Sequence, residues 1–255
     1  MGGALGFALG GPLGALMGAA LGHQLDKAAT AEALGDYSRQ ERTQTAFFTT
    51  TFAVMGHLAK ADGRVTPDEI ALANRVMVEL GLAPPLKRAA RRLFDEGKNP
   101  GFPLDAVLSQ FRRECHRSRN LLRIFLEIQF QAAYADGVVH PHERRVLEHI
   151  AETLGFTQHE YAQIENLARF GFAHHQAGAA PEAGVGRLDE AYGVLDVSED
   201  ASDTEVKRAY RRLMNQHHPD KLVSKGLPEE MMRAATEKTQ EIKLAYEQIK
   251  RARGK

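Results

Sequence analysis

Apolar residues recur at intervals of three and four through the middle of the chain, which is the spacing of one face of a helix. No segment there shows the alternation of apolar and polar residues that is typical of a strand. The positions that set this spacing are Phe48, Phe52, Met55, Leu58, Ala59, Ile70, Met77, Leu80, Leu104, Leu108, Phe111, Ile124, Ile128, Ala132, Val146, Leu147, Ile150 and Leu154. The pattern predicts an all-α domain over residues 43–170, with helices separated at prolines and glycines.

An Asp-Gly turn followed by a helix start occurs twice, as an internal repeat. The segments AKADGRVTPDE from Ala59 and AYADGVVHPHE from Ala133 align at an offset of 74 residues. The same offset aligns the tripeptide LGL at 80–82 with LGF at 154–156. We therefore expect two helical hairpins that pack as similar halves around one core.

Both copies also match the second half of a calcium-binding loop, in which Asp-Gly precedes a glutamate ligand. The first half lacks its carboxylates, because Leu58 and Lys60 hold those positions in the first copy and Ala132 and Tyr134 hold them in the second. In the first copy the segment 66–69 is also a capping box with proline at the first helical position. The sequence therefore favours a turn and a helix cap, and we expect no metal site.

This repeat, within an all-helical domain of this size, resembles the tellurite-resistance TerB-like family over residues 43–170. The resemblance implies metal binding through acidic residues in some members. The matching positions here are Asp62, Glu69, Asp136 and Glu143. A metal-responsive binding module is therefore the alternative function.

The first 25 residues carry no Asp, Glu, Lys or Arg. The run MGGALGFALGGPLGALMGAALG is about as long as a helix must be to cross a bilayer. Glycines recur along it every four residues, and such a stripe lets a second helix approach closely. The stripe consists of Gly6, Gly10, Gly14, Gly18 and Gly22. We predict a transmembrane anchor over residues 1–25 that dimerises through this stripe.

The first basic residues, Lys27, Arg39 and Arg42, all follow the apolar run. The positive-inside rule then places the bulk of the chain in the cytoplasm, beyond a juxtamembrane linker over 26–42. A cleaved signal peptide is less well matched, since no basic residue precedes the apolar run. A flexible Gly/Ala tail without a membrane role is the remaining alternative.

Residues 171–186, GFAHHQAGAAPEAGVG, are mostly small and show no periodicity, which predicts a flexible linker. The segment 187–255 returns to helical spacing. Ser202 and Glu205 form a capping box that opens a helix, and Val206, Tyr210, Leu213 and His217 are expected on its buried face. A second long helix follows, with core positions at Met231, Met232, Ala235, Ile242, Ala245, Tyr246 and Ile249. We expect these two helices to form an antiparallel hairpin.

The stretch MNQHHPDKL lies between the two helices of this hairpin. Pro219 disfavours helical angles at the residue before it, so the first helix should end there. His218, Pro219 and Asp220 are then expected on the loop at the tip. Four basic residues precede them on the exposed side of the helix, at Lys207, Arg208, Arg211 and Arg212. Their like-charge i,i+4 pairs each cost an isolated helix roughly 0.2–0.5 kcal/mol, which leaves either a solvated face or a docking face for an acidic partner.

Composition narrows the functional classes. Lys plus Arg and Asp plus Glu number 33 each, so no overall positive field points to nucleic acid. The single cysteine, Cys115, cannot form an internal disulfide, which fits a reducing compartment. The sequence shows neither a nucleophile with a paired base nor the spacing of metal ligands. We therefore expect no enzyme activity and no cofactor.

The hairpin, its basic helix and the downstream AYE together resemble a J-domain of the DnaJ co-chaperone family, over about residues 186–253. The resemblance implies that His218, Pro219 and Asp220 engage a DnaK-type chaperone and stimulate its ATP hydrolysis. It also implies that the basic face at residues 207–212 docks on that partner. A Gly/Phe-rich region and zinc-binding cysteines are missing, so a regulatory role fits better than general delivery of substrates.

The order of anchor, TerB-like domain, linker and J-domain (residues 187–255) resembles the DjlA family of membrane-anchored DnaJ-like co-chaperones in Gram-negative bacteria. The segment GHQLDKA at 22–28 adds to this resemblance. The family implies a single-pass protein of the inner membrane, with a short periplasmic amino terminus and a cytoplasmic bulk. It also implies contact with membrane lipid, a homodimer formed through the anchor, and a link to envelope-stress or capsule signalling.

Overall fold

The computed structural model describes residues 10–21, 39–61, 76–78, 80–134, 137–176 and 185–254. Within these ranges every regular element is a helix, which confirms the all-α prediction. The labelled helices are α2 (Gly11–Leu21), α3 (Arg39–Ala59), α5 (Pro84–Gly97), α6 (Leu104–Glu114), α7 (Arg119–Ala133), α8 (Pro141–Leu154), α9 (Gln158–Gln176), α10 (Val185–Leu195), α11 (Asp203–Gln216), α12 (Pro219–Val223), the 3-10 turn η3 (Glu229–Met231) and α13 (Met232–Ala252).

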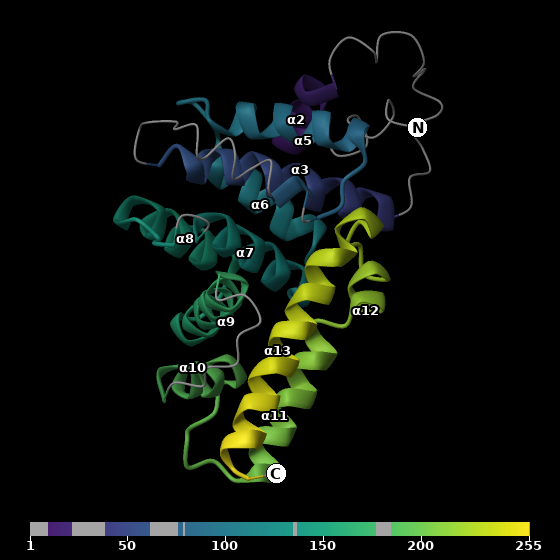
Figure 1. The fold of residues 1–255 in the computed structure, drawn as a ribbon. Helices are drawn as coiled ribbons and strands as arrows, with labels where there is room; N and C mark the ends of the chain where they lie inside the picture. Colours follow the sequence, from purple (N-terminus) through teal and green to yellow (C-terminus); the bar gives the residue numbers. More distant parts are fainter. Residues whose placement is uncertain are drawn as a thin grey trace.

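The helices are stacked along one direction of the molecule (Figure 1). In this view α2 and α5 lie above α3, and α7 and α8 lie below it. α9 comes next, and α10, α11 and α13 reach the opposite end, where the carboxyl terminus lies. Helix α9 contacts α7 on one side and α10 and α13 on the other, so it joins the two parts of the molecule.

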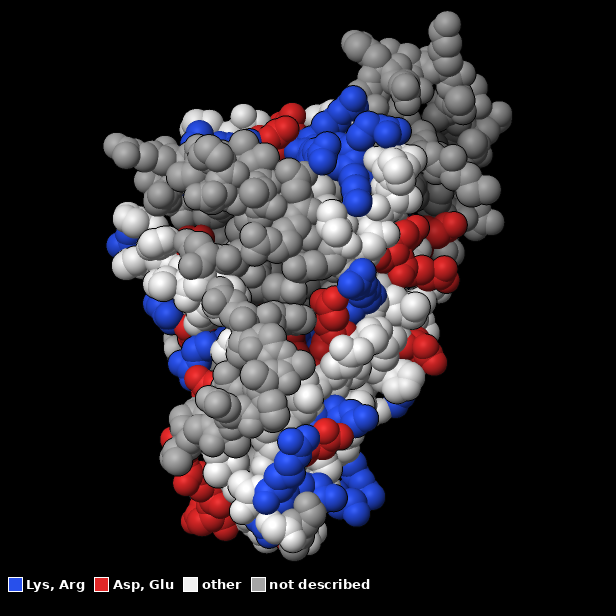
Figure 2. Space-filling view, viewed as in Figure 1, with Lys and Arg blue, Asp and Glu red and all other residues white. Residues whose placement is uncertain are grey.

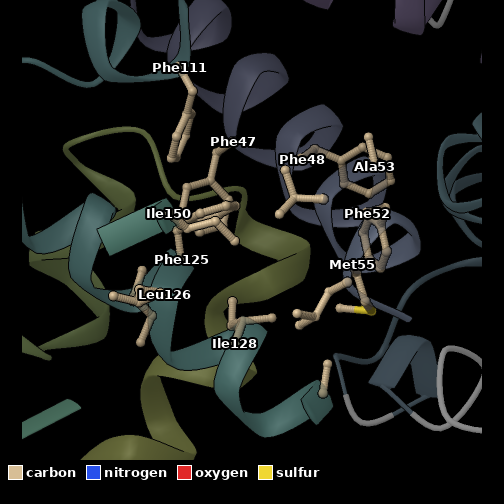
Figure 3. Packing of buried hydrophobic residues seen from close by; sticks show 14 of the residues in the cluster. Phe47, Phe48, Phe52, Ala53, Met55, Phe111, Phe125, Leu126, Ile128 and Ile150 are labelled. Atoms are coloured by element: carbon tan, nitrogen blue, oxygen red, sulfur yellow. The ribbon is translucent and has the colours of Figure 1, made fainter. Parts of the chain in front are cut away.

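Helices α3 and α7 form the centre of the upper part. α3 is buried on nearly every face from Thr43 to Ala59, as expected for a helix with neighbours all round. Three rings, Phe47 on α3, Phe111 on α6 and Phe125 on α7, meet between these helices (Figure 3). Their centroids lie 4.7 Å (Phe111–Phe125), 6.0 Å (Phe47–Phe111) and 6.4 Å (Phe47–Phe125) apart. Of these three rings the apolar spacing predicted only Phe111; Phe47 and Phe125 were not among the predicted core positions.

α3 and α5 touch through their backbones at two glycines. A Cβ atom at Gly56 of α3 would lie 1.9 Å from the carbonyl oxygen of Phe94, and one at Gly97 of α5 would lie 1.8 Å from that of Ala53. Neither oxygen can move aside as a side chain could. The close crossing of these helices therefore requires a residue without a side chain at both positions.

The internal repeat shows the same helix ending in both copies. Gly81 and Gly155 have left-handed backbone angles, with φ of 70° and 83°. The next residue donates its N–H five positions back in each copy, from Leu82 to Met77 at 3.2 Å and from Phe156 to Ala151 at 2.9 Å. This is the glycine-terminated helix ending that requires a left-handed residue. The aligned tripeptides of the repeat are thus structurally equivalent.

Helix α2 lies within the segment that was predicted to be an anchor. Its side chains at Leu13, Leu16, Met17 and Ala20 are buried. The helix contacts α3, α5 and α6. An apolar helix of the amino-terminal segment thus rests on the TerB-like domain.

Polar side chains hold both ends of α2. The amide of Gln110 accepts from the N–H of Leu13 at 3.0 Å and donates to the carbonyl of Gly10 at 2.9 Å. At the other end Arg92 donates to the carbonyl of Ala20 at 2.9 Å. The bonds to Leu13 N and to the Ala20 carbonyl satisfy main-chain groups that a helix leaves open at its ends. No helix in the described ranges combines the length and apolar character that a bilayer crossing requires.

The carboxyl-terminal hairpin shares its apolar clusters with the rest of the molecule. Five residues from Leu222 onward belong to the large cluster that contains the core of the TerB-like domain, namely Leu222, Leu227, Met231, Ala234 and Ala235. In the reverse direction, Leu167 and Phe170 of α9 belong to the second cluster, which the hairpin and α10 form. The TerB-like domain and the carboxyl-terminal hairpin therefore pack against each other in both apolar clusters.

Helix α9 continues to Gln176, so it extends into the segment predicted as a linker. Gly171 is buried there, and a Cβ at this position would lie 2.3 Å from a carboxylate oxygen of Glu241 on α13. The start of the predicted linker is thus helical because it packs against α13. Residues 177–184 lie outside the described ranges, and α10 begins at Val185.

Candidate functional site

The predicted capping box at the start of α11 is present. Glu205 N donates to Ser202 Oγ at 3.3 Å, and Ser202 N donates to Glu205 Oε2 at 2.7 Å. The hydrogen bonds from Ser202 hold the pKa of Glu205 below its ordinary value. Two open N–H groups at the helix start are satisfied in this way, which fixes where the site-bearing helix begins.

The buried face of α11 also lies where the spacing predicted it. Val206, Leu213 and His217 are all buried. Tyr210 is half-buried, and its ring stacks on Tyr246 of α13 with a centroid distance of 4.2 Å. Contacts between α11 and α13 close the hairpin, and this leaves the opposite face of α11 to solvent.

The turn at the end of α11 differs in one respect from the predicted loop. α11 ends at Gln216, and Pro219 already opens the five-residue helix α12. Proline is favoured at this first position, where its missing N–H would have no partner in the helix. His218 and Asp220 are both exposed, and Pro219 is half-buried. Two of the three residues thus form the start of a helix, which orders them more firmly than a loop would.

A side-chain link spans this turn. The ammonium group of Lys221 on α12 donates to the side-chain oxygen of Asn215 on α11. Leu222 N donates to the His218 carbonyl at 3.1 Å, which ties the start of α12 to the preceding residue. The bond between Lys221 and Asn215 therefore links α12 to α11 across the turn.

The basic residues of α11 are all exposed, as predicted. Arg212 differs from the others, because its guanidinium lies 3.6 Å from Asp196 and 3.5 Å from the carbonyl of Leu195. A helix rises about 1.5 Å per residue, which puts Arg211 roughly 7.5 Å along the helix axis from Gln216, the last residue of α11. Figure 2 shows basic side chains over the end of the molecule where α11 and α13 lie. The tripeptide and the basic residues thus belong to one hairpin and face solvent.

Sequence reasoning missed the contact beneath this turn. His217, next to the tripeptide, makes a buried ion pair with Glu127 of α7, with Nε2 and Oε1 2.8 Å apart. Lys238 and Glu241 of α13 form a second buried pair, at 2.8 Å. The signal for Glu127 was weak but present: the residue lies between Ile124 and Ile128 on a helix that is buried from Leu121 to Phe130.

Other candidate chemistry finds little support. Burial, and after it the charge of Glu114, raise the pKa of the Cys115 thiol, which disfavours the reactive thiolate. No group of three or more potential metal ligands occurs among the residues whose positions are described. Of the four acidic positions suggested by the TerB resemblance, Asp62, Glu69 and Asp136 lie outside those residues. Glu143 accepts from His140 N at 2.8 Å and so acts in a helix cap.

Comparison with known families divides the chain as follows. Residues 48–166 match the family of the tellurite resistance protein TerB, residues 190–254 match the DnaJ domain, and residues 1–41 match the co-chaperone DjlA transmembrane domain. No solved structure gives a significant match.

Curated relatives cover most of the chain. The co-chaperone protein DjlA of Yersinia pseudotuberculosis is 46% identical over 245 residues, which are 91% of this chain and 88% of the relative. The proteins of that name from Salmonella typhimurium and Vibrio parahaemolyticus are 45% and 44% identical, over 91% of this chain and 88% and 89% of their own lengths. With its TerB domain, its J-domain and its match to the transmembrane domain, this chain belongs to the family of DjlA co-chaperones.

Proposed function

We propose that this co-chaperone binds a DnaK-type chaperone through His218, Pro219 and Asp220 and stimulates its ATP hydrolysis. The observation that carries this proposal is the geometry of the turn. His218 and Asp220 are exposed, while the residues on either side are fixed by a buried ion pair at His217 and a side-chain link at Lys221. An exposed group on an ordered support binds at a lower entropic cost than a group on a flexible loop.

The basic residues of α11 orient the encounter with that partner. Lys207, Arg208, Arg211 and Arg212 form the basic face, and exposed charges of one sign steer a partner of opposite charge. The chain itself performs no chemistry in this scheme. Its contribution is to bind the state of the chaperone that hydrolyses ATP, since a ligand shifts an equilibrium only by its differential affinity.

The protein acts at the inner membrane, as a single-pass protein with a short periplasmic amino terminus and a cytoplasmic bulk. The anchor covers residues 1–25, and the TerB-like domain and the J-domain cover about 43–170 and 187–255. The predicted linkers over 26–42 and 171–186 are shorter than expected, because α3 begins at Arg39, α9 continues to Gln176 and α10 begins at Val185. The match of residues 1–41 to the DjlA transmembrane domain supports the anchor. To span the membrane, α2 must leave the contact with α3, α5 and α6 that the structure shows. Through the anchor the protein contacts lipid, and its co-chaperone activity feeds envelope-stress or capsule signalling.

The anchor also forms a homodimer through its glycine stripe. Leu13, Leu16 and Met17 make the face of α2 that packs on the TerB-like domain. Gly14 and Gly18 are only half-buried, and a Cβ at Gly18 would meet nothing within 4 Å. Part of the stripe is thus available to a second helix, which supports its use as a dimer contact. Gly6 and Gly22 lie outside the described residues.

Replacing His218 by glutamine in the full chain is expected to abolish stimulation of a DnaK-type chaperone. The measurement is single-turnover hydrolysis of ATP by the chaperone, with the co-chaperone in detergent. Glutamine keeps a polar side chain of similar length and lies on the exposed side of the turn, so the fold should be unaffected.

His142→Gln serves as the matched control, because His142 is an exposed histidine of α8, far along the chain from the hairpin. It should stimulate as the unchanged chain does. If the unchanged chain gives no stimulation, or if His218→Gln stimulates equally well, the proposed function is wrong.

Reversing two charges of the basic face, in the variant Lys207→Glu/Arg211→Glu, is expected to raise the co-chaperone concentration needed for half-maximal stimulation by about tenfold at low salt. The maximal rate should change little, since steering affects encounter more than the bound state. Higher salt should reduce the difference. Lys87→Glu/Arg88→Glu on α5 makes the same charge change elsewhere; an equal effect there would mean that net charge, and not this face, matters.

A further inference from the structure

The residue just before the exposed tripeptide points in the opposite direction, into the molecule. His217 is 1% exposed, and its side chain leaves the hairpin to reach α7 of the TerB-like domain. There its Nε2 lies 2.8 Å from Oε1 of Glu127, a residue that is fully buried. The exposed His218 and the buried His217 are thus consecutive residues with different partners. Because the two residues are adjacent in the chain, the position of the buried His217 constrains the position of the exposed His218.

Each ring nitrogen of His217 lies within hydrogen-bond distance of an oxygen atom. Its Nδ1 lies 2.9 Å from the carbonyl of Leu213, which can only accept, so Nδ1 carries a hydrogen. Its Nε2 faces the carboxylate of Glu127. Burial alone would raise the pKa of Glu127, but His217, Arg123 and Lys238 outweigh that effect and lower it. The carboxylate of Glu127 is therefore ionised, and its Oε1 lies 2.8 Å from Nε2 of His217.

The charged groups around this pair come from two helices. Arg123 of α7 donates to Gln163 at 3.0 Å, and Lys238 of α13 is paired with Glu241. Burial would lower the pKa of Lys238, but Glu241 and then Glu127 raise it, so it stays cationic. His217 and Glu127 thus sit in a buried polar group between the two domains, next to the apolar clusters that the domains share.

Two close glycine contacts restrict how the carboxyl-terminal hairpin can pack on the TerB-like domain and α9. Gly226, which follows α12 with φ of 111°, lies so close to α3 that a Cβ would be 2.5 Å from Cγ2 of Thr43. At the other side Gly171 lies directly against Glu241. The two glycines let the hairpin approach α3 and α9 closely at separate points. The pair of His217 and Glu127 adds a third contact between the hairpin and the TerB-like domain.

A buried ion pair adds little to the free energy of unfolding. Taking both charges out of water costs about as much as their attraction returns, and a well-packed apolar pair would serve at least equally well. The pair instead favours one relative orientation of the two helices, because a carboxylate and an imidazole form a hydrogen bond only within a restricted range of distances and angles. Apolar contacts, by contrast, are non-directional.

We propose that Glu127 is a positioning residue for the His-Pro-Asp turn, and that the TerB-like domain uses it, through His217, to set the orientation in which the J-domain meets its chaperone. The inference rests on the proposed function for its consequence but not for its geometry. In this arrangement the TerB-like domain contributes to the stimulation of the chaperone, and it needs no bound ligand to do so.

The test uses the full chain with Glu127→Ala, Glu127→Gln and a control, Glu165→Ala. Alanine leaves His217 buried without its counter-charge. Glutamine can donate its amide hydrogen to Nε2 of a neutral His217 and so keeps a bond. Glu165 is an acid of α9 that pairs with Arg144 of α8 at 2.8 Å, and this pair lies within the TerB-like domain.

The first measurement is hydrogen exchange of the backbone amides at residues 214–224, which needs no chaperone. Glu127→Ala should speed this exchange at least about a hundredfold relative to the unchanged chain, the factor expected when one partner of a buried ion pair is lost. Glu127→Gln should have a much smaller effect, and Glu165→Ala should leave these amides as they are. Unchanged exchange in Glu127→Ala would overturn the inference.

The second measurement is the maximal single-turnover rate of a DnaK-type chaperone at saturating co-chaperone. Glu127→Ala should lower it by about tenfold, since a misplaced group loses its effect steeply with distance. Glu127→Gln should restore most of it, which a loss of folding could not explain. Full stimulation by Glu127→Ala with a released turn would also overturn the inference. If the unchanged chain does not stimulate at all, the proposed function fails, and the exchange result alone then decides whether Glu127 holds the turn.

Discussion

Replacing Gly56 by alanine is expected to lower the free energy of unfolding by about 3 kcal/mol, the upper part of the range for overpacked cores. The added methyl group would lie 1.9 Å from the carbonyl oxygen of Phe94, so α3 and α5 would have to move apart. Alanine favours a helix over glycine by about 1 kcal/mol, and the clash must exceed this gain. Urea denaturation followed by far-UV circular dichroism measures the change.

Gly101→Ala is the control for this substitution. Gly101 lies in the loop before α6, and a Cβ there would meet nothing within 4 Å. Its effect should stay within about 0.5 kcal/mol. The close crossing of α3 and α5 would be refuted if Gly56→Ala were as stable as the unchanged chain.

Replacing Phe170 by alanine is expected to lower the free energy of unfolding by about 3–5 kcal/mol, as for other large buried side chains. Phe170 belongs by sequence to the TerB-like domain, but its ring packs in the cluster of the J-domain, with Ile242 and Leu213. The loss should therefore appear as faster amide exchange in α10, α11 and α13, as well as at the end of α9.

Phe172→Ala provides the comparison, two residues further along the same helix. Phe172 is half-buried and packs on the other cluster, against Tyr134, with ring centroids 6.2 Å apart. Its loss should be smaller, and it should leave exchange in α11 unchanged. Equal exchange patterns in the two variants would contradict the placement of Phe170 in the J-domain cluster.

The J-domain hairpin could be predicted in detail because its signals are local. The capping box at Ser202, the apolar positions from Val206 to Leu213 and the proline at 219 all act within a few residues of chain. In the TerB-like domain the spacing predicted buried positions such as Phe52, Leu58 and Ile128, but it missed Phe47 and Phe125. The prediction for the turn was incomplete, because a proline after a helix can also open a new one, and α12 was missed.

The joint between the domains could not be predicted, because it depends on surfaces that are distant in sequence. Glu127 and His217 are 90 positions apart. Charged side chains are rarely buried unless they are paired, so a lone Glu on a helix is normally assigned to solvent. Lys238 and Glu241 have the spacing of an ordinary surface pair on a helix, and they are buried because α13 packs against α7 and α9. The contact of α2 with the TerB-like domain was missed for a similar reason, since its apolar run also suits a membrane.

The two shared apolar clusters limit where the J-domain of this protein could be exchanged for that of another protein. If the chain from Val185 onward were replaced by the J-domain of another protein, the new domain would keep the contacts within itself. Leu167 and Phe170 would lose the J-domain residues against which they pack. Glu127 would also lose its histidine, unless the incoming hairpin carried one before the tripeptide. A segment that is exchanged with both of these contacts intact must therefore include α7 as well as α9 to α13, and a chimera cut at the apparent domain boundary should be less stable than either parent.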